Sequence, residues 1–359
     1  MKKQLRSCKT KEIVVHYSRG IPLLPCRSKD SNETGKGILT MKLSNNFKGS
    51  AILVFTALLW GSTFVMQAYA AEYLPPFFVN AFRSIVGALF LFAFLAIRSL
   101  VKKVPIFPRG KEKIRELLLG TVICGVLLTI SVNLQQFGIS AYPAGVSSEA
   151  RGGFLTALYV VLVPLFAIFF KKRPHPLVWF AGFVALGGIA LLCFAGEVGG
   201  VYLGDVYMLL CAISFTFHIF AVAKFGASID GPLLCMAQFL VCSILSLILS
   251  FVTGEVAAIT KTAFLSGLPY LLYVGVVSSG IAYTLQIVGQ KYAEPAIASL
   301  SMSMESVFAA LCGWIFRGSK LSFREVVGCA VVFLAIVMAQ IPDLIKRKAD
   351  KSKNEPEKV

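Results

Sequence analysis

Long apolar runs recur along the chain, and they constrain its fold more than any other feature. Ten of them have the length of a membrane-spanning helix, which needs about 17–25 residues. They lie at 49–71, 76–97, 117–138, 152–170, 177–196, 203–223, 232–253, 265–288, 294–316 and 322–341. Because the runs are continuous rather than alternating, they predict an all-α membrane protein and exclude a transmembrane β-barrel.

Composition supports this reading and argues against a soluble protein. The 359 residues are 57% hydrophobic and 15% charged, whereas soluble proteins carry about 25% charged residues. The net charge of +17 would be typical of a nucleic-acid-binding protein if the cations formed one surface. They lie instead in the tails and in a few short loops, so we expect the lipid bilayer as a partner and no nucleic acid.

The distribution of Lys and Arg predicts the orientation, because cytoplasmic loops collect these residues. From residue 41 on, about 20 basic residues fall on one side of the predicted spans, mainly in the loops 98–115 and 171–176 and in the C-terminal tail. Five fall on the other side. We therefore predict a multi-pass protein of the plasma (inner) membrane with both termini cytoplasmic and a basic cytoplasmic tail at 342–359.

The first 48 residues form a basic tail without a spanning run. Its apolar stretch at 21–25 is too short for a signal peptide. Two interpretations stay open: a basic cytoplasmic arm, or translation that starts at Met41.

The two halves of the chain resemble each other, which indicates an internal duplication. Placing Gly49 over Gly204 brings Pro76 near Pro232 in the next run, and Gln135 matches Gln286 in the run after that. The halves are 49–196 and 203–341, with five predicted helices each. Consecutive halves with an odd number of spans insert in opposite orientations, so the sequence predicts two inverted five-helix repeats, a transporter architecture.

Several stretches match a known family. They are LLWGSTF at 58–64, Pro75-Pro76 followed by Arg83, GFLTALYVVLVPL at 153–165 and ESVFAA at 305–310. On these residues the region 49–341 resembles the drug/metabolite transporter superfamily, and its EamA-type branch in particular. The resemblance implies a ten-helix secondary transporter that exports small molecules.

The second half departs from the family pattern at two places. Ser306 stands where Pro usually follows the Glu, and Ser319 lies where an acidic residue is usual. The resemblance therefore does not carry over a kink in the ninth helix or an ion pair in the last loop. In the first half, Pro164 predicts a bend near the middle of the fourth helix.

Charged side chains inside a membrane span cost roughly 2.5–3.5 kcal/mol on insertion scales, so each one needs a reason. Arg83 has two interpretations: binding an anionic group of the substrate, or a structural pair. Glu305 is a proton-coupling candidate, because burial disfavours the charged form of a carboxyl group; the alternative is a pairing with a neighbouring helix, such as with Arg83. His218 is a second proton-coupling candidate or a buried neutral His.

Uncharged polar and aromatic residues could line a substrate site or join helices. The candidates for substrate binding beside Arg83 are Trp60, Asn133, Gln135, Gln136, Tyr159, Tyr283 and Gln286. Glu149 and Arg151 precede the fourth run, where they are either a gate ion pair or a solvated helix start.

Enzyme signatures are absent from the sequence. The three histidines form no HExxH motif, no metal site is indicated, and there is no phosphate-binding loop of the Walker type. We expect no cofactor. The nine cysteines include no CxxC pair, so we interpret them as structural.

The prediction is a secondary transporter that moves a small polar or amphipathic metabolite, amino-acid-like or drug-like, across the plasma membrane by alternating access. Export and proton coupling are favoured by the resemblance. The alternatives are an uncoupled facilitator or exchanger and, from another class, a membrane-embedded lipid-modifying enzyme. A small-molecule substrate is the expected partner, and a homodimer stays open.

Overall fold

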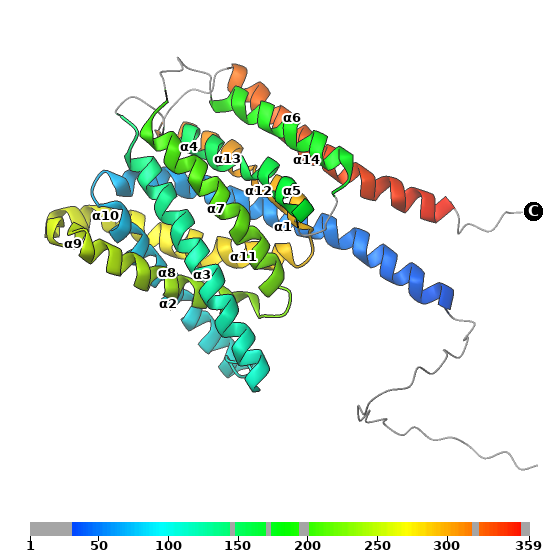
Figure 1. Cartoon of the computed structure of the whole chain (residues 1–359), viewed down its shortest axis with the longest axis horizontal. Helices are drawn as coiled ribbons and strands as arrows, with labels where there is room; N and C mark the ends of the chain where they lie inside the picture. The colour runs from blue at the N-terminus through cyan, green and yellow to red at the C-terminus, as the bar shows by residue number, and fades with distance from the viewer. Residues whose placement is uncertain (1–30, 144–147, 170–173, 194–200, 318–322, 353–359) are drawn as a thin grey trace, which may run out of the picture. The chain divides into compact units, whose positions relative to one another are not determined.

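The structure is a computed structural model that describes residues 31–143, 148–169, 174–193, 201–317 and 323–352. These ranges fold into helices joined by short connections and contain no β-strand (Figure 1). Residues up to Leu39 form a separate unit, and the description below concerns the compact unit from Thr40 to Val359.

The helices follow the predicted apolar runs. Those of the first half are α1 (Ser31–Ala71), α2 (Pro76–Lys102), α3 (Lys111–Ser140), α4 (Ser148–Thr156), α5 (Tyr159–Phe169) and α6 (Pro176–Cys193). Those of the second half are α7 (Leu203–Phe225), α8 (Gly231–Val252), α9 (Glu255–Ala258), α10 (Lys261–Tyr273), the π-helix η1 (Val274–Ala282), α11 (Tyr283–Gln290), α12 (Pro295–Met302), α13 (Glu305–Arg317) and α14 (Phe323–Ser352).

Seven helical stretches in the described residues are long and apolar enough to cross a membrane. This confirms the prediction of an all-helical, multi-pass membrane protein. The other three predicted spans, 152–170, 177–196 and 322–341, contain shorter apolar helices at Tyr159–Phe169, Pro176–Leu191 and Val326–Ala339. The count of ten spans therefore stays a prediction.

Three of the predicted spans are not regular α-helices. The fourth run is divided between α4 and α5 at Ala157–Leu158, where amide groups bond to carbonyls three residues back, as in Val160 N to Ala157 O at 2.9 Å. Pro164 lies inside α5, after this interruption, and the bend expected at Pro164 stays a prediction. The ninth run is divided at Ser303–Met304 although Ser306 is not a proline.

The third irregular span contains the π-helix η1 between α10 and α11. Long π-helices are rare, and those that occur inside α-helices often lie at functional sites. Here the π-helix directly precedes Tyr283, which begins α11.

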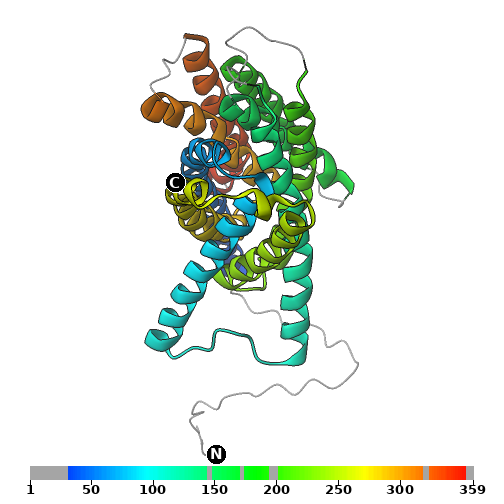
Figure 2. The same cartoon turned by 90° about the vertical axis from the view of Figure 1, so that its left-hand side faces the viewer.

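Helices from the two halves pack against each other. α2 packs along α8, α3 packs along α7 and α8, and α6 packs along α14, as Figure 1 shows for the last pair. Of the two divided helices, α4 contacts α13 and α5 contacts α12. Figure 2 shows the last turns of α2 and the first turns of α3 diverging toward the segment that joins them.

Small residues allow two of the closest helix contacts. A Cβ atom on Gly61 would lie 2.5 Å from Cβ of Phe308, and one on Gly87 would lie 2.5 Å from Cβ of Ser279. Such small-residue contacts are typical of helix packing in membranes. Large apolar side chains such as Phe92, Phe94 and Ile97 are exposed on the outer face of α2, as expected for a surface that faces lipid.

Candidate functional site

A cavity of about 30 Å³ lies among helices of both halves. Its lining includes Trp60, Thr63, Phe64, Gln67, Arg83, Gln135, Thr156 and Tyr159 from the first half, and Phe215, Ile219, Ser278, Tyr283, Gln286, Met302 and Glu305 from the second. Seven of the predicted substrate or proton-coupling residues thus meet at one place. Small-molecule sites measure about 300–1,000 Å³, so the cavity is too small for such a ligand in this conformation.

Two buried, oppositely charged side chains line this cavity without forming an ion pair. Arg83 is 1% exposed, and its Nη1 donates to Oε1 of Gln67 at 2.8 Å. Glu305 is 4% exposed, and its Oε1 accepts from the hydroxyl of Tyr159 at 2.9 Å. The pairing of Glu305 with Arg83 that the sequence left open is not formed. Each has a neutral hydrogen-bond partner, which leaves Arg83 available to an anionic group of a solute and Glu305 available to a cationic group or a proton.

The two divided helices bring Glu305 to the cavity. Tyr159 is the first residue of α5 and Glu305 is the first residue of α13, so each lies where its helix resumes after the interruption. The hydroxyl of Ser306 also donates to the carbonyl of Gly153 at 3.0 Å. The N-terminal end of a helix favours negative charge, so the start of α13 is a suitable place for a carboxylate.

Several polar atoms at the cavity are buried and have no hydrogen-bond partner in the structure. They include the donors Nε1 of Trp60 and Nε of Arg83 and the acceptor Oε1 of Gln286. Buried polar groups are normally hydrogen-bonded, and each exception in a native structure needs an explanation. A bound solute with both acceptor and donor groups would satisfy these atoms.

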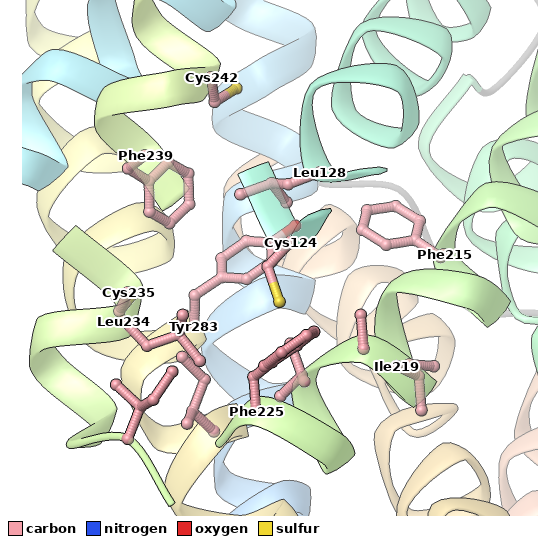
Figure 3. Close-up of a cluster of buried hydrophobic side chains, with 14 of the residues drawn as sticks. Cys124, Leu128, Phe215, Ile219, Phe225, Leu234, Cys235, Phe239, Cys242 and Tyr283 are labelled. Carbon is pink, nitrogen blue, oxygen red and sulfur yellow. The ribbon is translucent and has the colours of Figure 1, made fainter. Parts of the chain in front are cut away.

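Aromatic rings form the apolar part of the lining. The rings of Trp60 and Tyr283 meet edge to face with centroids 4.9 Å apart, and Tyr283 meets Phe239 in the same way at 5.1 Å. Figure 3 shows Tyr283 in the middle of a buried cluster that also includes Leu128 and Phe215. The cluster holds the ring of Tyr283 in place beside the cavity.

Three predicted residues lie away from the lining of this cavity. Asn133 joins helices, because its amide donates to Oγ of Ser246 at 2.9 Å and its Oδ1 accepts from Asn80 at 2.9 Å. Gln136 donates to the backbone carbonyl of Gln67 at 3.5 Å. His218 is buried, and its Nε2 lies 3.1 Å from Oε1 of Gln238 on α8. These contacts join neighbouring helices, although Oε1 of Gln136 and Nδ1 of His218 are buried without a hydrogen-bond partner among the described residues.

The gate candidates Glu149 and Arg151 fall in α4, but their side chains lie outside the described residues. Ser319, in the last loop, also lies outside them. Among the residues that the structure describes, no group of three His, Cys, Asp or Glu side chains is placed to hold a metal ion.

Comparison with known proteins identifies the family. The model of the EamA-like transporter family matches residues 47–194 and again residues 202–340. The chain belongs to this family.

Relatives of this EamA-like protein are described as transporters. One is the Escherichia coli K12 protein described as "Uncharacterized inner membrane transporter YedA", 26% identical over 79% of this chain and 88% of that protein. An "Uncharacterized transporter" from Archaeoglobus fulgidus is 26% identical over 80% of this chain and 84% of that protein. A crystal structure of a protein with 19% identity covers 83% of this chain and 98% of that chain with a TM-score of 0.65, which concerns the fold alone. The chain is therefore a membrane transporter, and its family points away from an enzyme.

The face of α1 that carries Trp60 also supplies cavity residues that the sequence analysis missed. Thr63 and Phe64, from the motif at 58–64, and Gln67, three residues beyond it, line the cavity with Trp60. They are spaced three, four and seven residues from Trp60, which places them on one face of a helix. The helical repeat would have identified these three once Trp60 was chosen. Ser278 had no comparable signal, because it lies in the π-helix, where the repeat of an α-helix does not apply.

Proposed function

We propose that this protein is a secondary transporter that moves a small polar or amphipathic metabolite across the plasma (inner) membrane by alternating access, in the direction of export and coupled to protons. The observation that carries the proposal is the cavity between the halves, which is lined by Arg83 and Glu305 without an ion pair between them. Such charges inside a membrane protein typically mark substrate or ion pathways.

The proposed architecture is ten spans in two inverted five-helix repeats. The two separate matches to the family model support it. So do the helix contacts: α4 with α13 and α5 with α12 are the contacts expected when two divided helices cross in opposite directions at their interruptions. Inverted repeats bind their substrate at the interface of the halves, often beside discontinuous helices.

The lining also supports a class of solute. Arg83 suits an anionic group, and its free Nε adds a second donor beside that of Trp60. Glu305 and the free Oε1 of Gln286 suit a cationic or hydrogen-donating group. Aromatic rings from Trp60 and Tyr283 suit an apolar body. These features fit an amino-acid-like or drug-like molecule.

The proposed coupling depends on Glu305. The ionised carboxylate can bind either a proton or a cationic group of the solute. Once it is protonated it no longer attracts the cationic group, so the proton and the solute bind in alternation. The cavity must enlarge and open to either side for a solute to enter. The two divided helices are places where the regular α-helix is already interrupted. We propose that opening occurs by relative movement of these segments.

The test is solute flux in proteoliposomes that contain the full chain, with and without a pH gradient. Candidate solutes come from metabolites that accumulate outside cells overproducing the protein. The proposal expects a solute whose transport the gradient accelerates. Equal flux with and without the gradient would instead indicate the uncoupled facilitator or exchanger. Accumulation of a lipid product without solute movement would contradict transport altogether.

A further inference from the structure

A second hollow lies where α2 ends and α3 begins, and its lining shares no residue with that of the central cavity. It measures about 540 Å³ and is lined by residues from the end of α2, the start of α3 and the turn from α7 to α8. Its lining combines cations, including Lys102 and Lys113, with apolar side chains such as Ile106, Phe107 and Leu233. This groove takes no part in the function proposed above.

Some of the charged side chains that line the groove have partners, and others do not. Arg98 forms a bidentate pair with Asp230 at 2.9 and 3.1 Å, and Glu116 accepts from Ser228 at 2.6 Å. Lys102 and Lys113 have no hydrogen-bond or ion-pair partner among the described residues. Three cations and two acids line the groove, so its net charge is positive, and the surplus lies on the two lysines.

We propose that this groove binds an anionic phospholipid, with its phosphate between Lys102 and Lys113 and an acyl chain along the apolar wall. A soluble anion would use the lysines alone and leave the wall formed by Ile106, Phe107 and Leu233 without a ligand. A zwitterionic lipid would leave the surplus positive charge unmatched. A lipid that is both anionic and apolar uses both parts of the lining.

The surroundings of the groove favour a lipid occupant over a soluble one. Leu100, Val101 and Leu118, which lie within five residues of Lys102 or Lys113 in the chain, are 79%, 75% and 61% exposed. Apolar surface exposed to this degree beside cations is typical of the interface between headgroups and acyl chains. The predicted orientation places the groove in the cytoplasmic leaflet, where anionic lipids are enriched.

The positive-inside rule alone would also explain basic residues in this loop, so the test must separate a site from general charge. Lys102 and Lys113 line the groove. Lys103 and Lys111 lie within two residues of them in the chain but do not line it. All four side chains are exposed. The variant K102Q/K113Q and the control K103Q/K111Q therefore remove the same charge from the same segment without disturbing the core.

The measurement is the midpoint of thermal unfolding of the purified full chain in detergent, titrated with phosphatidylglycerol or with phosphatidylcholine of the same acyl chains. For the wild type and the control we expect a saturable rise with phosphatidylglycerol only. For K102Q/K113Q we expect about tenfold more phosphatidylglycerol to be needed, because each Lys adds substantially to the attraction of an anionic headgroup.

Three outcomes would overturn the proposal. Equal weakening in the control would show that binding follows the charge of the whole connection. An equal rise with phosphatidylcholine would show that the headgroup charge is irrelevant. The same rise with inorganic phosphate or glycerol phosphate would assign the groove to a soluble anion. No solute is needed, so the result does not depend on transport.

Discussion

The two divided helices share a backbone plan but differ in chemistry. α4–α5 and α12–α13 both stop and resume in the middle of an apolar run, and each contacts the other at the interruption. The first resumes at Tyr159, a neutral donor, and the second at Glu305, the carboxyl group that accepts its hydrogen bond. One half of the molecule therefore supplies a carboxyl group, and the other half supplies the hydroxyl group that bonds to it.

The largest expected effect comes from removing the charge at the second interruption. E305Q keeps the shape of the side chain and an oxygen that can accept from Tyr159, but it cannot ionise. We expect gradient-driven transport to fall to the level of protein-free vesicles while exchange of solute continues. Flux measured with and without a pH gradient checks this. Unchanged driven transport would remove Glu305 as the proton-coupling residue.

Removing the donor at the first interruption should have a smaller effect. Y159F deletes the hydrogen bond to Glu305 and keeps the ring. A hydrogen bond to a charged group contributes about 1.5–3 kcal/mol, so we expect driven transport to slow by about tenfold without being abolished. Initial rates in the same vesicles measure it. If Y159F were as inactive as E305Q, the division of roles between the two helices would be wrong.

The third prediction concerns how the second divided helix is held. Gly61 on α1 allows a close contact with Phe308 on α13. When the two halves are aligned, Gly61 of the first half matches Thr216 on α7 of the second half, so the second half has a larger residue there. G61A should therefore destabilise the protein by about 1–3 kcal/mol through overpacking. The matched control is G187A, where a Cβ would meet no atom within 4 Å. Equal unfolding midpoints for the two variants would show that α13 can shift without cost.

The smallest expected effect belongs to the bond that ties the two interruptions together. S306A removes the hydrogen bond to the carbonyl of Gly153, which we expect to lower stability by about 1 kcal/mol. S306P, which restores the residue usual in the family, also removes the amide that donates to the carbonyl of Ser303 at 3.3 Å, so we expect it to lower stability by about 2 kcal/mol. Thermal unfolding checks both. A large loss in S306P alone would mean that the serine determines the path of the chain.

Much of the fold could be predicted because lipid imposes simple rules. Continuous apolar runs predicted the positions of nearly all the helices. The motif residues Trp60, Arg83 and Tyr159 indicated the family, and they also line the cavity. The repeat gave Gln135 and Gln286, which both line the cavity. Apolar length and helical repetition are local properties, so a sequence reveals them directly.

Other parts of the site could not be predicted, because they depend on contacts between distant segments. Asn133 and His218 are polar and buried like the cavity residues, but they bond to partners on α8 and are not among the residues that line the cavity. Ser278 reaches the cavity through a π-helix that no local pattern indicated. A polar residue in a span must find a partner, and the sequence does not say which one.

The amino-acid sequence is enough to identify a multi-pass helical membrane protein of a transporter family, because hydrophobic length and motif spacing are properties of consecutive residues. Three further features follow from tertiary contacts: two helices are interrupted, Glu305 bonds to Tyr159 rather than to Arg83, and Lys102 and Lys113 border a groove. Those outcomes depend on which helices meet, since buried polar groups are satisfied by neighbours that lie far away in the chain.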